Sequence, residues 1–325
     1  MKTALVTGIN GQDGSYLAEF LLGKDYEVHG VLKRNSIAEN QTARIDHLYP
    51  RIKNNLYHAD MCDMASLLNV IKKVEPDEIY NLAAQSHVKV SFDQPLYTLD
   101  TIASGTLNLL ELIRLLDPSI KLYQASSSEM FGNSVDEDGY QRETTPMHPV
   151  SPYGCAKLCA YNLVRCYRQS YGIFASNGIL FNHESPRRGS TFVTNKVVKE
   201  AVKIKKGLSE QLVLGNLDSK RDWGHAKDYV RMMWEILQLD NPDDYVCATG
   251  VSHSIRELCD YVFGKLDLNY KDYVVQDRRF FRPLELNNLR GDPSKLNETT
   301  KVRLIYSFTS MLDDMIDYWL ENINA

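Results

Sequence analysis

The sequence predicts an α/β protein with a doubly wound parallel sheet and a smaller C-terminal α+β lobe. Through the first half of its 325 residues, short apolar runs alternate with stretches of helical periodicity. Such alternation is typical of a parallel sheet covered by helices on both faces. Beyond residue 180 the alternation breaks, and a polar, proline-containing stretch at 183–188 precedes mixed helix and strand patterns. This change predicts a second, smaller lobe over the carboxyl edge of the sheet.

Each element follows from its own pattern of apolar residues. Short apolar runs in the first half predict strands at 4–6, 26–32, 55–59, 78–82, 121–125 and 179–181. Apolar residues spaced three and four apart predict helices at 16–22, 64–74, 98–116 and 153–171. In the second half, the same criteria predict helices at 193–205, 226–239 and 311–320 and a strand at 211–215, whereas 272–290 has few helix signals.

Composition narrows the class of protein. Hydrophobic residues make up 43% of the chain, which is enough for a sizeable core, and the formal charge of −5 contains no long run of one sign. No apolar run approaches the ~20 residues that a membrane span requires, and the N-terminus lacks a long apolar signal core. We therefore expect a soluble cytoplasmic protein whose function involves neither nucleic acid nor a membrane.

The six cysteines contain no Cys-x-x-Cys pair, so they give no sign of metal or disulfide chemistry. Free cysteines fit a reducing compartment. Cys155, Cys159 and Cys166 fall at helical spacing, which we interpret as one packed helix face.

Three spaced glycines follow the first predicted strand and open the first helix. Glycines let the backbone turn tightly and approach a pyrophosphate, which the helix N-terminus attracts. The spacing is G-x-x-G-x-x-G, and the alternative, a plain strand–helix turn, seldom carries three spaced glycines. We expect a Rossmann-type dinucleotide-binding domain over 1–180, to which the chain returns around 216–250, and a mostly substrate-binding remainder over 181–325. The cofactor contacts expected from this loop are Gly8, Ile9, Asn10, Gly11, Gln12, Asp13 and Gly14.

The end of the second strand favours NADP over NAD. An acidic residue usually stands there when the ribose 2′-hydroxyl is free, whereas this chain has Lys33 and Arg34, which suit a 2′-phosphate. A solvated basic turn is the alternative. Asp60 follows the third strand and could accept from the adenine amino group. Small residues follow the fourth strand and would let a cofactor lie close, although a buried strand end would look the same. The cofactor residues expected from these segments are Lys33, Arg34, Asn35, Ser36, Asp60, Leu82, Ala83, Ala84, Gln85 and Ser86.

Tyr153 and Lys157 are the candidate catalytic pair. They stand four residues apart, about one helical turn, so their side chains share a helix face. A lysine beside a tyrosine favours the phenolate, and we expect Lys157, with a nicotinamide cation, to lower the pKa of Tyr153 toward neutrality. Such a tyrosinate takes a proton from an alcohol, whose oxygen the hydroxyl of Ser127 could hold.

Glu129 adds a carboxylate that alcohol oxidation alone does not need. Elimination of water requires one group to remove a proton next to the new ketone and one group to protonate the leaving hydroxyl. A helix-capping or surface acid is the alternative. The combination of Ser127, Glu129, Tyr153 and Lys157 therefore predicts oxidation followed by elimination.

These motifs resemble the extended short-chain dehydrogenase/reductases. Within that family, longer stretches resemble the members that dehydrate GDP-mannose, and these stretches are 6–19, 180–189, 215–218, 221–230, 281–283 and 291–293. The resemblance implies a redox-neutral conversion of GDP-mannose to GDP-4-keto-6-deoxymannose with NADP. It also implies a homodimer or homotetramer, because 34–49 resembles a stretch that crosses between subunits in the family.

The resemblance further implies residue roles, position by position. Tyr153 would deprotonate the C4 hydroxyl, Lys157 would tune Tyr153 and hold the nicotinamide ribose, Ser127 would bind the C4 oxygen, and Glu129 would work at C5 and C6. Further cofactor contacts would come from Met61, Tyr97, His183 and Arg188. Substrate contacts would come from Ser86, Asn182, Lys196, Arg221, Arg282 and Glu285.

Two other functions stay open at this point. A sugar-nucleotide epimerase would use Tyr153 and Lys157 but leave Glu129 idle. A non-catalytic dinucleotide sensor could keep the same fold, although the intact Ser127, Tyr153 and Lys157 argue against it.

Overall fold

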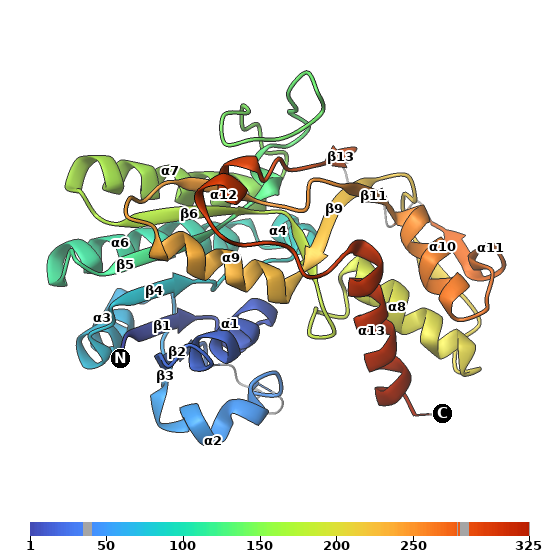
Figure 1. Cartoon of the computed structure of the whole chain (residues 1–325), viewed down its shortest axis with the longest axis horizontal. Helices are drawn as coiled ribbons and strands as arrows, with labels where there is room; N and C mark the ends of the chain where they lie inside the picture. The colour runs from blue at the N-terminus through green and yellow to red at the C-terminus, as the bar shows by residue number, and fades with distance from the viewer. Residues whose placement is uncertain (35–40, 278, 280–285, 325) are drawn as a thin grey trace.

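A seven-stranded parallel sheet forms the larger part of the molecule. The computed structural model describes residues 1–34, 41–277, 279 and 286–324, and within these ranges the strand order is β10-β6-β5-β4-β1-β2-β3 (Figure 1). The order reverses between β1 and β4, the place where such sheets bind ligands. The strands are β1 (Thr3–Thr7), β2 (Glu27–Leu32), β3 (Leu56–His58), β4 (Glu78–Asn81), β5 (Lys121–Ser127), β6 (Ala175–Leu180) and β10 (Asp244–Cys247).

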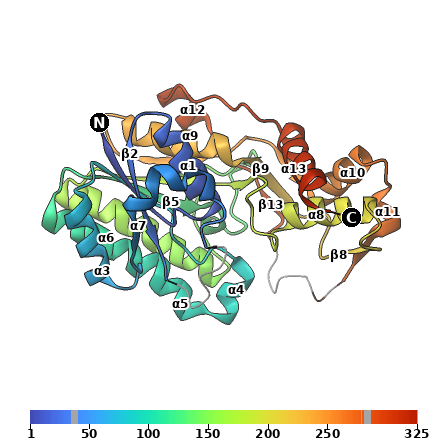
Figure 2. The same cartoon turned by 90° about the horizontal axis from the view of Figure 1, so that it is seen from below.

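Helices cover both faces of this sheet, as the alternating pattern predicted. One face buries a core against α1 and α9, and the other buries a core against α3, α6 and α7 (Figure 2). The doubly wound fold class is thus confirmed. The helices of this part are α1 (Gln12–Leu22), α2 (Tyr49–Ile52), α3 (Met64–Val74), α4 (Val88–Asp93), α5 (Pro95–Leu99), α6 (Gly105–Leu116), α7 (Pro152–Tyr171), α9 (Ala226–Gln238) and α12 (Ser294–Thr299).

The smaller part is built around β9, which pairs with β7, β11 and β13. Its core lies between α8, α10 and α13 and includes the buried Trp223. β8 and β12 form a separate parallel pair. The elements are β7 (Asn182–Glu184), β8 (Leu212–Leu214), β9 (Lys220–His225), β11 (Ser252–Ser254), β12 (Val274–Gln276), β13 (Asn288–Leu289), α8 (Val193–Lys205), α10 (Ile255–Lys265), α11 (Tyr270–Tyr273) and α13 (Phe308–Asn322).

After β9 the chain goes back to the large sheet. α9 packs against α1, and β10 pairs with β6 at the edge of the sheet. The segment expected to return, 216–250, therefore contains β9, the central strand of the small lobe, as well as β10 at the edge of the large sheet. The exact division into domains stays a prediction. No helix in the described part of the chain combines the length and the apolar character needed to cross a bilayer.

The cysteine prediction was wrong in direction. Cys155, Cys159 and Cys166 do share one face of α7, but that face is exposed. The opposite face, which carries Tyr153, Ala160 and other residues, is the buried one. Helical spacing identifies a stripe of residues without showing whether the stripe faces the core or the solvent.

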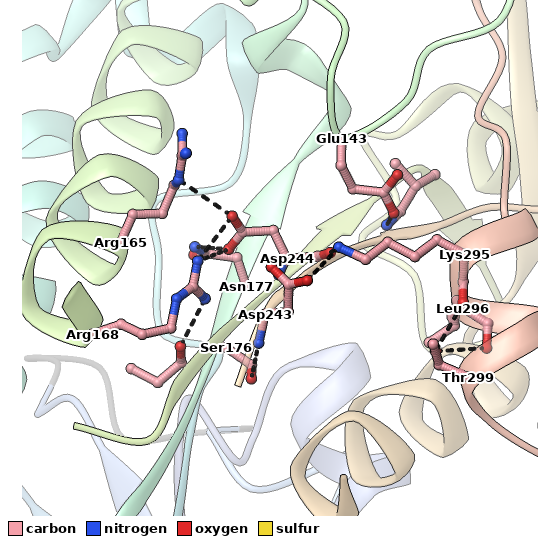
Figure 3. A network of polar contacts seen from close by, with 12 residues as sticks. Glu143, Arg165, Arg168, Ser176, Asn177, Asp243, Asp244, Lys295, Leu296 and Thr299 are labelled. Carbon is pink, nitrogen blue, oxygen red and sulfur yellow. Dashed lines mark hydrogen bonds and ion pairs between the residues drawn. The ribbon is translucent and has the colours of Figure 1, made fainter. Parts of the chain in front are cut away.

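A buried ion-pair network fixes α7 to the edge strand β10. Figure 3 shows Asp244 between the guanidinium groups of Arg165 and Arg168. Arg168 Nη2 lies 3.0 Å and Arg165 Nε 3.4 Å from Asp244 Oδ2, and Asn177 Nδ2 donates to Oδ1 at 2.8 Å. Because α7 carries Tyr153 and Lys157, this network contributes to the placement of the catalytic helix.

We expect Asp244→Ala to lower the free energy of unfolding by about 3 kcal/mol, because it leaves the largely buried guanidinium of Arg168 without its carboxylate. Urea denaturation measures the change. Asp243→Ala is the matched control: it removes the neighbouring, half-exposed carboxylate that pairs with Lys295, and we expect a loss below about 1 kcal/mol. Equal losses of stability in the two variants would contradict the view that the pair of Asp244 with Arg168 stabilises the fold more than the exposed pair does.

Candidate active site

One cavity of about 770 Å³ opens at the carboxyl ends of the central strands of the large sheet and extends to the small lobe. Most of the site residues expected from the sequence line it. These are Gly8, Asn10, Gly11, Gln12, Asp13, Gly14, Lys33, Asp60, Met61, Leu82, Ala83, Ala84, Ser86, Tyr97, Ser127, Glu129, Tyr153, Lys157, Asn182, His183, Arg188, Lys196 and Arg221.

Three expected cofactor residues in the described part do not line the cavity. Ile9, within the glycine loop, has a fully buried side chain, and Gln85 is hydrogen-bonded to the backbone of His87. Arg34 is exposed. Asn35, Ser36, Arg282 and Glu285 lie outside the described residues.

The glycine loop is packed so tightly that side chains are excluded. Gly8 adopts a φ of +68°, a conformation that favours glycine. A Cβ on Gly14 would lie 2.3 Å from the carbonyl oxygen of Gly8. The first turn of α1 therefore lies directly against the loop, and its N-terminus faces the cavity, which is the arrangement that binds a pyrophosphate. This cradle fits a dinucleotide.

We expect Gly14→Ala to weaken NADP⁺ binding at least about tenfold and to destabilise the fold by about 1–3 kcal/mol, because the added methyl must push α1 away from the loop. Calorimetric titration and thermal unfolding measure the two effects. Gly23→Ala, at the other end of α1, is the control, since its Cβ would meet nothing closer than 3.4 Å. Unchanged cofactor binding by the Gly14 variant would contradict this account.

At the end of β2, three expected cofactor residues meet. Lys33 Nζ lies 3.0 Å from Asp60 Oδ2 and donates to the hydroxyl of Tyr97 at 2.9 Å. Burial alone would raise the pKa of Asp60, but a backbone N–H from Cys62 and the ammonium of Lys33 lower it. A charged ammonium group thus stands where the sequence placed the 2′-phosphate of NADP, and it fits that group.

The four catalytic candidates come together beside this cradle. Ser127 ends β5 and accepts a hydrogen bond from Glu129 N at 3.2 Å, which starts a short turn. Tyr153 and Lys157 lie on the buried face of α7, whose start is fixed by the side chain of Ser151 capping Gly154 N at 3.0 Å. A Cβ on Gly154 would lie 2.8 Å from the carbonyl oxygen of Glu129. Glycine at 154 therefore lets α7 approach the Glu129 turn.

Lys157 by itself does not lower the pKa of Tyr153, and the lowering expected from Lys157 together with a nicotinamide cation stays a prediction. Burial raises the pKa of Tyr153 to about 12; Ser127 opposes this, and the carboxylate of Glu129 adds to it. Lys157 donates to the carbonyl of Ala125 at 2.7 Å, and its Nζ lies 5.8 Å from the centroid of the Tyr153 ring. Burial lowers the pKa of Lys157 to about 8. Residue spacing shows that the two groups are neighbours, but it does not show how strongly burial opposes a phenolate.

On the substrate side, the expected Asn182, Lys196 and Arg221 line the same cavity. Lys196 Nζ donates to Val213 O at 2.6 Å, and Arg221 Nη1 donates to Leu286 O at 2.9 Å. These cations suit a diphosphate.

Several residues that line the cavity were not predicted from the sequence. Glu184 and Arg187 lie inside the stretch 180–189 that the resemblance covered, so their place there was a usable signal. Asn216 lies in the stretch 215–218 and Arg44 in the stretch 34–49, both of which the resemblance also covered, whereas Lys89 stands in a segment with no motif of its own.

Comparison with known proteins identifies the family of the chain. The family model described as GDP-mannose 4,6 dehydratase matches residues 5–315. The chain belongs to this family. GDP-mannose 4,6 dehydratase 2 of Arabidopsis thaliana is 52% identical, over 98% of this chain and 87% of the plant protein. The GDP-mannose 4,6 dehydratase of Homo sapiens is 47% identical, over 97% of this chain and 90% of the human protein. The resemblance found in the sequence is therefore confirmed.

Solved structures show the same fold. RMD from Pseudomonas aeruginosa, complexed with NADPH, has a TM-score of 0.82 at 23% identity and covers 99% of this chain and 100% of its own. The dTDP-glucose 4,6-dehydratase of Bacillus anthracis, in complex with NAD, has a TM-score of 0.83 at 23% identity and covers 99% and 97%. Both likenesses concern the fold.

Proposed function

We propose that this protein is a GDP-mannose 4,6-dehydratase, a lyase that forms GDP-4-keto-6-deoxymannose. The observation that carries this proposal is the presence of Glu129 in the cavity that also holds Ser127, Tyr153 and Lys157. Oxidation of an alcohol needs one base, whereas dehydration needs a second group that can both accept and donate a proton. The family to which the chain belongs supports the same reaction.

The chain's own residues account for binding and proton transfer. The positive charges of Lys157 and of a bound nicotinamide would favour the phenolate of Tyr153, against the burial that raises its pKa. The phenolate would then accept the proton of the C4 hydroxyl, while Ser127 holds the C4 oxygen. Glu129 then removes the C5 proton and gives a proton to the C6 hydroxyl, which leaves as water. NADP held by the glycine loop would supply hydride transfer, taking a hydride at C4 and returning it at C6, and C5 would then regain one proton, which balances the proton that Tyr153 takes from the C4 hydroxyl. Lys157, fixed on Ala125 O, holds positive charge near Tyr153 throughout.

The proposed ligands follow the two ends of the cavity. The glycine loop, Lys33 and Asp60 would hold NADP. Lys196 and Arg221 would hold the diphosphate of GDP-mannose, and Arg282 and Glu285 are proposed as further substrate contacts on the resemblance alone.

We also propose a cytoplasmic homodimer or homotetramer. The six cysteines are free, which supports a reducing compartment. Apolar side chains stand exposed on α4 and α5, among them Phe92, Leu96 and Leu99, which supports burial against a second copy of the chain. Light scattering of the purified protein measures the assembly, and a monomer at micromolar concentration would contradict it.

Incubation with GDP-mannose and NADP⁺, followed by mass spectrometry, tests the reaction. We expect a product lighter than GDP-mannose by one water, with no net reduction of the cofactor. A product of unchanged mass with altered stereochemistry would indicate an epimerase. No product, with NADP⁺ still bound, would indicate a dinucleotide sensor.

A further inference from the structure

His183 contacts an acceptor at each of its two ring nitrogens. Nε2 lies 2.9 Å from Asp13 Oδ2, and Nδ1 lies 2.8 Å from the carbonyl oxygen of Phe181. A carbonyl oxygen cannot donate a hydrogen bond, and an ionised carboxylate cannot either. A neutral imidazole has only one N–H, so it could satisfy only one of these contacts. The geometry therefore fits a histidine that carries both protons.

The pair joins two parts of the chain across the wall of the cavity. Asp13 lies in the first turn of α1, between the last two glycines of the glycine loop, and His183 lies in the middle of β7. Gln12 strengthens the connection: its Nε2 donates to His183 O at 3.1 Å and its Oε1 accepts from Ser185 Oγ at 2.7 Å. Both Asp13 and His183 line the cavity.

The remaining groups around the imidazole hold it in place. Tyr229 of α9 stacks on its ring at 4.4 Å between centroids. Arg188, after β7, is the other nearby charge, and it opposes a cation at His183. Burial also disfavours that cation, yet the carboxylate of Asp13 raises the pKa of His183 above its ordinary value. Burial would raise the pKa of Asp13, but His183 lowers it to about 2, so Asp13 is ionised at neutral pH.

We propose that Asp13, which is partly exposed to the cavity, and the buried His183 form a carboxylate–imidazolium pair that holds the glycine loop against β7 and so sets the affinity of the site for its dinucleotide. This inference rests on the proposed function, since the dinucleotide is NADP. It changes the role expected for His183: both ring nitrogens face protein acceptors, so the residue acts as a positioning residue through Asp13.

The pair has a consequence for pH dependence. The stability that the charged His183 gives to the folded state is fully present below the ordinary imidazole pKa of about 6.5. It is lost as pH rises through the raised pKa of His183. The stability that the ionised Asp13 gives to the folded state is lost only as pH falls through its pKa of about 2. Loss of the imidazolium leaves the carboxylate of Asp13 without its partner near the catalytic helix. Its negative charge then favours the protonated forms of Tyr153 and Lys157. Cofactor affinity should therefore fall on the alkaline side.

Nitrogen-15 NMR of the histidine side chains tests the charge state directly. The chain has 8 histidines, and comparison of the wild type with His183→Gln assigns the signals of His183. At about pH 7.5 we expect both ring nitrogens of His183 to be protonated in the wild type, and one of them to lose its proton in Asp13→Asn. A neutral His183 in the wild type at that pH would overturn the proposal. This experiment needs no cofactor, so it is independent of the proposed function.

Titration with NADP⁺ between about pH 6 and pH 9 tests the effect on affinity. We expect wild-type affinity to weaken as pH rises, and His183→Gln to bind about ten- to a hundredfold more weakly at neutral pH, with no alkaline decline. His58→Gln, at an exposed position at the end of β3, should behave as the wild type does. A His183→Gln protein that keeps wild-type affinity or the alkaline decline would overturn the proposal. Failure of the wild type to bind NADP⁺ would instead refute the proposed cofactor.

Discussion

Glu129→Gln should lower the rate of water loss from GDP-mannose by about 10²- to 10⁴-fold, the range typical of a lost general acid–base group. Glutamine has nearly the same shape and leaves the turn between β5 and α7 intact, so the change removes the proton-transfer group and little else. Tyr153, Ser127 and Lys157 remain, and oxidation at C4 does not need Glu129. The variant should therefore still oxidise the sugar.

A single-turnover experiment separates the two steps. With stoichiometric GDP-mannose, the Glu129→Gln protein should accumulate reduced nicotinamide, which absorbs in the near ultraviolet, together with a 4-keto sugar that has lost no water. The wild type should show little accumulation, because elimination follows at once. Glu137→Gln, at an exposed position in the 131–151 loop that does not line the cavity, is the control and should keep the wild-type rate. Turnover by Glu129→Gln within a few-fold of the wild type would remove Glu129 from the mechanism.

Local patterns were sufficient for six of the seven strands of the large sheet and for the cofactor cradle, whereas the edge strand β10 was not predicted. The glycine loop, the strand ends and the Tyr153–Lys157 spacing are short-range features, and parallel topology brings the carboxyl ends of the strands to one edge. The helix predicted at 64–74 is α3 with the same bounds. Such features need no knowledge of what packs against them.

The small lobe was less predictable, because its elements are short and depend on partners far along the chain. β9 pairs with β7, β11 and β13, which are separated from it by between roughly 25 and 70 residues. α10 was not predicted, although Ser254 and Glu257 form a capping box that marks its start. That signal was present in the sequence and could have been used.

Burial was the property that sequence patterns did not supply. The stripe of Cys155 and Cys159 faces the solvent, and the same helix places Tyr153 where burial raises its pKa. The pairing of Asp13 with His183 joins residues that are 170 positions apart, so no local sequence pattern around either residue predicts it. These features depend on which surfaces meet in the fold.

Tyr153→Phe should abolish the reaction at its first step, with a loss in kcat/KM of about 10²- to 10⁴-fold. The phenol lies in a buried position where burial holds its pKa at about 12, so the free enzyme keeps it protonated at neutral pH. Phenylalanine keeps the ring and its packing, and we therefore expect NADP⁺ affinity to stay within a few-fold of the wild type. Unlike Glu129→Gln, this variant should accumulate no reduced nicotinamide, because oxidation at C4 fails.

The contrast between the two variants decides the order of events. If Tyr153 acts first and Glu129 second, only the Glu129 variant traps an oxidised sugar, and the double variant behaves like Tyr153→Phe alone. Tyr161→Phe, on the same helix face but hydrogen-bonded to Asp244 away from the cavity lining, controls for loss of a buried phenol and should retain turnover. Reduced cofactor accumulating with Tyr153→Phe would show that another group takes the C4 proton. Lys157, whose pKa burial lowers to about 8, would then be the residue to test, since above that pH its amine can accept a proton.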